Sequence, residues 1–387
     1  MGYAFFVTMF GATLPTPLYP IYSREFGISA VYITVIFAAY AVGVLASLLL
    51  FGKLSDRVGR RPVLIPGLVV SLVSSVVFLV ASDTALLYVG RVLSGLSAGV
   101  FTGTATATMV DLAPGGKRAV ATAFAVAVNL GGLAAGGLLA GVLADVAPQP
   151  LRGPYVAHIV LLVPAFAGIL LMPETAGRPP GERRFVLQRL RIPPELHGIF
   201  GRAATVGFCG FAVSALFGAV APTVLVRLLD LHSHTLAGVL VFLLMSLSAA
   251  GQLTTSRFSQ GAAFVLGCSL LVLGLGCLAI ALLAKALAWL LISALAVGAG
   301  QGLVIGSGLA AINSRVSLER RGEAASTYFV VLYIGLMLPV VGDGFVGEAI
   351  GLQSAGVVFT AIVGAVVLLV LASLAVGRNR MVTAGAP

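Results

Sequence analysis

Apolar runs of about 20 residues, separated by short polar segments, recur along the whole chain. A run of this length is what one α-helix needs to cross the hydrocarbon of a bilayer. A membrane β-strand would instead leave alternating segments of about ten residues. The pattern therefore predicts an all-α membrane protein with twelve transmembrane helices, near residues 2–22, 31–51, 63–81, 84–110, 119–144, 155–172, 202–226, 235–255, 261–283, 286–311, 323–346 and 352–376.

One polar segment, residues 173–201, is much longer than the other connections. It separates six predicted helices in residues 1–172 from six in residues 202–387, so we expect two helical bundles joined by a cytoplasmic linker. Arginine and apolar residues are interleaved between Arg183 and Leu190. Part of the segment could lie as an amphipathic helix on the membrane surface. A solvated linker is equally compatible with the sequence.

A weak internal repeat relates the two sets of helices. Two basic tetrapeptides, residues 115–118 and 318–321, precede the fifth and the eleventh predicted helices. Internal repeats of this kind are common in membrane transport folds and indicate two structurally related halves. Alignment on the tetrapeptides superposes two pairs of glycines, Gly132 with Gly335 and Gly141 with Gly344.

The composition excludes a water-soluble globule, because 59% of the residues are hydrophobic and only 9% are charged, with a mean hydropathy of +1.10. The net charge is +10, and 18 of the 23 basic residues fall in loops or the tail on one side, the side of residues 52–61. This asymmetry predicts that this side and both termini lie in the cytoplasm. We therefore expect the lipid bilayer as a partner and no nucleic acid.

The sequence contains no pattern that is typical of an enzyme or a metalloprotein. The three cysteines, Cys209, Cys268 and Cys277, lie in predicted helices and lack metal-ligand spacing. A phosphate-binding loop, a dinucleotide fingerprint and a nucleophile motif are all missing from the sequence. We expect no catalytic activity, no cofactor and no metal site.

The polar turn between the second and third predicted helices carries an ordered set of glycine and charged residues. Asp56 and Arg60 are four residues apart, so one helical turn brings their side chains together. The turn resembles the signature G-x-L-x-D-R-x-G-R-[RK] of the major facilitator superfamily, whose fixed positions are matched by Gly52, Leu54, Asp56, Arg57, Gly59, Arg60 and Arg61. The resemblance implies two pseudo-symmetric six-helix bundles that move a solute by alternating access. It also implies that Asp111 joins Asp56 and Arg60 in an inner gate that stabilises the outward-open state.

The Arg91–Gly95 pair of the fourth helix resembles the R-x-x-x-G motif of that family. Two further stretches resemble its twelve-helix drug–proton antiporter branch: the proline-rich end of the first helix, and the glycine-rich residues 129–137 of the fifth, which lack the usual proline. An arginine inside an apolar run normally faces a partner or a water-filled cavity. We therefore place Arg91 in a substrate cavity, with snorkelling toward the outer surface as the alternative.

Other polar and aromatic residues within the predicted helices could together line a central cavity. Such a cavity would be mostly apolar with a few polar anchors, which suits a small amphipathic or hydrophobic substrate. Each residue alone could equally be a packing residue. The candidate lining residues are Tyr19, Tyr40, Arg91, Asn129, Phe208, Gln301, Asn313, Tyr328 and Tyr333.

A proton-coupled carrier needs a titratable group within the membrane. The candidates are Asp343 in the eleventh helix and His158 in the sixth, because histidine titrates near neutrality. The resemblance implies a multidrug efflux transporter of the bacterial inner membrane that works by proton antiport, and we expect a monomer. An uncoupled facilitator, an importer, and a sensor or scaffold that does not transport remain alternatives.

Overall fold

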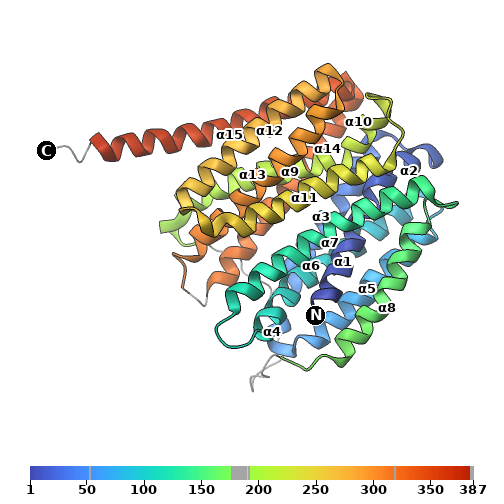
Figure 1. Cartoon of the computed structure of the whole chain (residues 1–387), viewed down its shortest axis with the longest axis horizontal. Helices are drawn as coiled ribbons and strands as arrows, with labels where there is room; N and C mark the ends of the chain where they lie inside the picture. Colours follow the sequence, from blue (N-terminus) through green and yellow to red (C-terminus); the bar gives the residue numbers. More distant parts are fainter. Residues whose placement is uncertain (52–53, 176–189, 191, 318–319, 384–387) are drawn as a thin grey trace.

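The computed structural model describes residues 1–51, 54–175, 190, 192–317 and 320–383. These residues form helices and connecting turns, and no β-strand occurs among them (Figure 1). The helices are α1 (Gly2–Thr13), η1 (Thr16–Leu18), α2 (Tyr19–Glu25), α3 (Ala30–Phe51), α4 (Leu54–Val58), α5 (Arg61–Leu79), α6 (Thr84–Asp111), α7 (Arg118–Val146), α8 (Gly153–Leu171), η2 (Pro194–Leu196), α9 (His197–Ala219), α10 (Ala221–Arg227), α11 (His234–Thr254), η3 (Thr255–Arg257), α12 (Gln260–Ala284), α13 (Leu287–Asn313), α14 (Arg321–Ile350) and α15 (Leu352–Thr383).

Twelve helical stretches within the described residues are long and apolar enough to cross a membrane, which confirms the number predicted from the sequence. The first span, Gly2–Glu25, is built from three pieces: α1, the 3-10 turn η1, and α2. Pro15 and Pro17 stand at this break, because proline has no backbone N–H to donate and holds its φ near −65°. The α-helix is therefore interrupted at this point of the span.

The seventh span begins earlier than the hydropathy pattern indicated. The helix α9 starts at His197, after the short turn η2, so residues 197–201 are helical rather than part of a linker. Residues 176–189 and 191, which include the possible amphipathic segment, lie outside the described residues. The division of the chain into units at residues 173–201 stays a prediction.

The glycine pairs of the internal repeat make equivalent contacts in space. A Cβ at Gly132 of α7 would collide with the backbone of Phe6 in α1, and a Cβ at Gly335 of α14 would collide with the backbone of Phe208 in α9. Gly141 and Gly344 lie further along the same two helices, α7 and α14. Each packs against a helix from the other half of the chain: Gly141 against His234 of α11, and Gly344 against Thr34 of α3. The two halves of the chain thus repeat one packing scheme.

The helices α3 and α6 cross at a contact that only glycine allows. A Cβ at Gly95 would collide with the carbonyl oxygen of Tyr40, and a Cβ at Gly43 would collide with that of Val92. Small residues let membrane helices approach closely, which increases van der Waals contact where no hydrophobic driving force exists between helices. This contact fixes the position of Arg91, one turn before Gly95 on α6.

Two faces of the molecule are distinguished by what lies on them (Figure 1). One face carries the arginine loop, residues 54–61, which comprises α4 and the turn that leads to Arg61; we call it the arginine-loop face. The opposite face, which we call the far face, carries α2 and α10, and these two helices contact each other. Between the faces, α7 packs against α11 and α3 packs against α14. These two contacts join the first six spans to the last six.

Candidate transport cavity and gate

A central cavity of about 300 Å³ lies between the first six and the last six spans. Its walls come from eight helices and one turn, namely α1, η1, α3, α6, α7, α9, α11, α13 and α14. Most of the lining is apolar, including Phe37, Phe211 and Phe217. The volume lies at the lower end of the range typical of small-molecule sites.

Arg91 contributes the one charged side chain in the described lining of the central cavity. It is 2% exposed and lies about 10 Å along α6 from Thr84, so its guanidinium lies in the cavity rather than at the membrane surface. Its Nη1 donates to the carbonyl of Ala12 at 2.8 Å and its Nη2 to that of Phe37 at 3.5 Å. The guanidinium also lies over the ring of Tyr40, 4.8 Å from the centroid. No carboxylate neutralises the charge of Arg91 within the part of the chain that the structure describes.

Polar groups beyond Arg91 are spread over both halves of the cavity. Ser214 of α9 donates a 2.6 Å hydrogen bond to Gln301 of α13, which joins two helices of the second half. Thr102 and Thr106 line the cavity from α6, eleven and fifteen residues after Arg91, and these spacings place all three on one helix face. That face could have been recognised in the sequence, and our interpretation missed the two threonines.

The central cavity extends toward the arginine-loop face and is closed at the far face. Its lining reaches Thr122, near the start of α7, which is exposed at the arginine-loop end. At the other end, Asp145 of α7 accepts hydrogen bonds from the backbone N–H groups of His234 and Thr235 at 2.9 and 2.8 Å. Ser233 and the His234 ring contact the same carboxylate, at 3.0 and 2.9 Å. Asp145 therefore caps the first turn of α11 across the two halves and holds the far face together.

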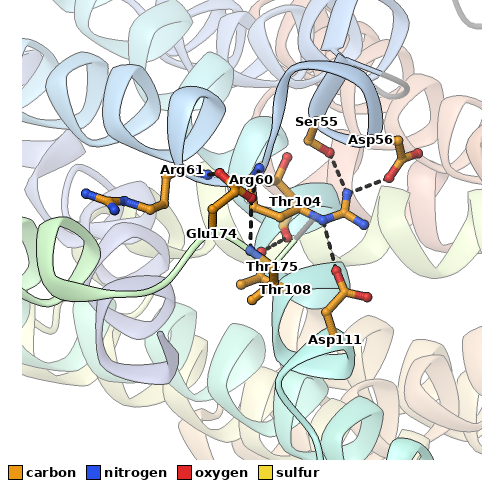
Figure 2. A network of polar contacts seen from close by, with 9 residues as sticks. All are labelled: Ser55, Asp56, Arg60, Arg61, Thr104, Thr108, Asp111, Glu174 and Thr175. Atoms are coloured by element: carbon orange, nitrogen blue, oxygen red, sulfur yellow. Dashed lines mark hydrogen bonds and ion pairs between the residues drawn. The ribbon is translucent and has the colours of Figure 1, made fainter. Parts of the chain in front are cut away.

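At the arginine-loop face, the buried Arg60 side chain is held by three acceptors (Figure 2). Its Nη1 donates to Ser55 Oγ at 2.8 Å and to Asp56 Oδ1 at 2.5 Å, and its Nε donates to Asp111 Oδ2 at 3.1 Å. These charge-assisted bonds connect α4, the following turn and the end of α6. All three partners belong to the first six spans, so the contacts of the Arg60 side chain organise one half rather than joining two. Gly52 lies outside the described residues.

Glu174, which our sequence interpretation did not place in the gate, is part of the same cluster (Figure 2). Its carboxylate accepts hydrogen bonds from the backbone N–H groups of Arg60 at 2.7 Å and Arg61 at 3.0 Å, at the start of α5. Gly59 turns the chain beneath it with φ +106°, and a Cβ there would lie 2.7 Å from Glu174 Oε2. A carboxylate at a helix N-terminus neutralises the positive end of the helix dipole. The end of the sixth span is thus fastened to the arginine loop.

A sequence model described as Major Facilitator Superfamily matches residues 1–339 and, in a second alignment, residues 205–385. The chain belongs to the Major Facilitator Superfamily. Members of this family are multi-pass membrane transporters rather than enzymes. The fold and the twelve spans agree with this membership.

Individual relatives of this facilitator match it over limited stretches. The quinolone resistance protein NorA of Staphylococcus aureus is 26% identical over 141 residues, which is 36% of this chain and 36% of NorA. The multidrug resistance protein MdtL of Escherichia coli is 35% identical over 100 residues, which is 26% of each chain. The matches thus span about a third or less of the relatives' own length.

Two solved structures share the fold of this facilitator over nearly its whole length. One is a bacterial homologue of the human lysosomal transporter Spinster in an inward-facing, unoccupied conformation, with a TM-score of 0.70, 15% identity and coverage of 96% of this chain and 95% of that chain. The other is the human organic anion transporter MFSD10, with a TM-score of 0.69, 16% identity and coverage of 96% and 97%. At these identities the likeness concerns the fold alone.

The structure separates the predicted cavity residues of the facilitator into two groups. Tyr40, Arg91, Asn129, Gln301 and Tyr333 line the central cavity together. The lining of that cavity does not include the others, Tyr19, Phe208, Asn313 and Tyr328. The part that each residue plays in transport stays a prediction.

The two predicted proton-coupling residues both lie away from the central cavity. His158 of α8 is 1% exposed, and its Nε2 donates to the carbonyl of Val7 at 3.0 Å, because a carbonyl can only accept. Its Nδ1 then accepts from the hydroxyl of Ser75 at 2.7 Å, so the ring bridges α1, α5 and α8. Asp343 of α14 lines a separate groove between α9, α14 and α15. Their coupling role stays a prediction.

Proposed function

We propose that this facilitator exports small amphipathic compounds by alternating access and that a proton gradient drives the export. The observation that carries the proposal is the central cavity, which combines apolar walls with a few polar groups and the buried guanidinium of Arg91. A hydrophobic body gains from the apolar walls, and a carboxylate or other acceptor on the substrate gains from Arg91. Amphipathic compounds with an acceptor or a negative charge are therefore the favoured cargo.

The direction of access supports export. The cavity extends toward the arginine-loop face, and the excess of basic residues on that side supports a cytoplasmic location for it by the positive-inside rule. A substrate can then enter from the cytoplasm or the inner leaflet while Asp145 holds the far face closed. The names of the relatives NorA and MdtL, which refer to drug resistance, also favour efflux.

The proposal of proton antiport rests on other observations than the proposal of export. Among the described residues, the lining of the central cavity includes no aspartate, no glutamate and no histidine that could carry the coupled proton. Antiport therefore rests on the resemblance to drug–proton antiporters and on the relatives, not on a carboxylate that touches the cargo. The alternative of an uncoupled facilitator predicts the same cavity and a different response to pH.

The test is flux through the purified full chain in proteoliposomes. Three fluorescent dyes of similar size are used, one with a carboxylate, one neutral and one cationic, with and without an imposed pH gradient. We expect protein-dependent flux that is fastest for the carboxylate dye and is accelerated when protons can flow in the opposite direction. A Val160→Ala variant, on the lipid-exposed side of α8, is the matched control and should behave as the native chain.

The possible outcomes separate the parts of the proposal. Dye flux that does not depend on the pH gradient would contradict antiport and would indicate uncoupled, facilitated transport. Absence of protein-dependent flux for all three dyes would contradict the amphipathic substrate class. A preference for the cationic dye would contradict the role given to Arg91.

A further inference from the structure

A second cavity lies on the side of the last six spans, between α9, α14 and α15, and is separate from the central cavity. Its volume is about 620 Å³. We call it the lateral groove, and its walls are mainly apolar side chains and small residues from these three helices. The rim is formed by Val346, Val358 and Ile362, whose side chains are exposed on the surface that the spans turn to the lipid. A hydrophobic molecule dissolved in the bilayer can therefore reach the lateral groove without entering the central cavity.

One side chain in the lateral groove does not fit an apolar surface. Asp343 of α14 lines the groove and is 6% exposed, and its Oδ1 is buried without a hydrogen-bond partner among the described residues. No ion pair of Asp343 occurs in the described part of the chain. A polar group buried in hydrocarbon without a partner is costly, and an acidic residue within a span normally faces a partner or a functional path. Among the described residues, no side chain donates a hydrogen bond to Oδ1 of this carboxyl, although Thr205 lines the same groove.

The chemistry of Asp343 defines the missing group. An acceptor oxygen without a partner requires a hydrogen-bond donor, and a carboxylate in an apolar site favours a donor that carries positive charge. A protonated amine supplies both, whereas a quaternary ammonium supplies no N–H group and a lipid acyl chain supplies neither. The apolar walls require that the rest of the molecule be hydrophobic.

We propose that the lateral groove is a binding site for hydrophobic amines, which enter from the bilayer and pair their protonated nitrogen with Asp343. Asp343 lies seven residues before the end of α14, or about 10 Å below the far face. An amine that enters from the far leaflet can thus place its nitrogen at Asp343 while its chain follows α9 and α15 toward the middle of the membrane. The site differs in charge from the central cavity, where Arg91 repels a cation, so the proposal does not depend on the identity of the transported compound.

The sequence offers a matched set of variants for the test. Asp343→Asn keeps the size of the side chain and removes the charge. Gly342→Leu fills the groove from a glycine that lines it and has open space where a Cβ would stand. Gly276→Leu makes the same change at an exposed position of α12 outside the groove, where a Cβ would also meet open space. Asp343→Asn carries the test alone if Gly342→Leu fails to fold.

The experiment is photo-crosslinking of the full chain in phosphatidylcholine nanodiscs. The probe is a twelve-carbon primary amine with a diazirine in its chain, and the companion probe carries a hydroxyl group in place of the amine. Labelled peptides are identified by mass spectrometry. We expect the amine to label the segments 201–209 and 342–366, with at least fivefold less labelling in Asp343→Asn and Gly342→Leu and no change in Gly276→Leu or Arg91→Gln.

Three results would overturn the proposal. Equal labelling of the groove by the amine and the alcohol would show that any lipid-like chain fills it. Unchanged amine labelling in Asp343→Asn would show that the carboxyl does not select the ligand. Labelling that is confined to residues lining the central cavity, and disappears in Arg91→Gln, would place the amine in the transport site instead.

Discussion

Replacement of Arg91 by glutamine should remove transport while leaving the protein nearly as stable as before. The native guanidinium gains about 1.5–3 kcal/mol from its 2.8 Å bond to the carbonyl of Ala12 and little from the 3.5 Å contact with Phe37. The contact with the ring of Tyr40 adds about 1–2 kcal/mol. Against this stands a cost of about 2.5–3.5 kcal/mol for an arginine inside a membrane helix.

The two sums largely offset each other, so Arg91 stabilises the fold by about 2.5 kcal/mol at most. The neutral amide in Arg91→Gln avoids the desolvation cost and keeps a donor, and we expect little change in thermal stability. Binding of an anionic substrate should suffer more, because loss of one partner of a buried charge pair costs at least about 2 kcal/mol, or roughly 30-fold in affinity. A lysine keeps the charge but cannot reach two carbonyls or stack its face on a ring, so Arg91→Lys should be intermediate.

The assay compares the melting temperature of each purified variant with the concentration dependence of carboxylate-dye flux in proteoliposomes. A variant that keeps its melting temperature and loses flux supports a functional charge. The reasoning would be refuted if Arg91→Gln unfolded at a much lower temperature, since Arg91 would then be a structural residue. Native concentration dependence in Arg91→Gln would refute it as well.

Three further substitutions test other parts of the structure. In Asp56→Asn the free energy of unfolding should fall by less than about 1 kcal/mol, because the carboxylate is 61% exposed, yet flux should drop; full flux would contradict the gate. Gly95→Leu should prevent stable insertion, measured as loss of monodisperse protein, because no space exists beside the Tyr40 carbonyl. Asp145→Ala removes the cap on α11, and a cysteine probe placed near the far end of the cavity should react faster with a water-soluble maleimide; an unchanged rate would show that the far face is held by packing alone.

The sequence was informative where the property in question is local. Hydropathy is read residue by residue, and it gave the number of spans because a bilayer imposes one length on each helix. The pairing of Asp56 with Arg60 was accessible for the same reason, since four residues make one helical turn. The glycine repeat also indicated the relation between the halves, because close backbone contact excludes any larger residue.

The tertiary structure decided which polar residues share a site. Glu174 is 114 residues from Arg60, and no local pattern connects the two. Asn129 and Gln301 line the same central cavity only because α7 and α13, far apart along the chain, both border it. The helix α14 is apolar on nearly all sides, so its sequence shows no stripe that would tell which face is buried against which neighbour. Packing turned Tyr333 toward the central cavity and Asp343 toward the lateral groove, and that choice depends on contacts with α9 and α15 that lie far away along the chain.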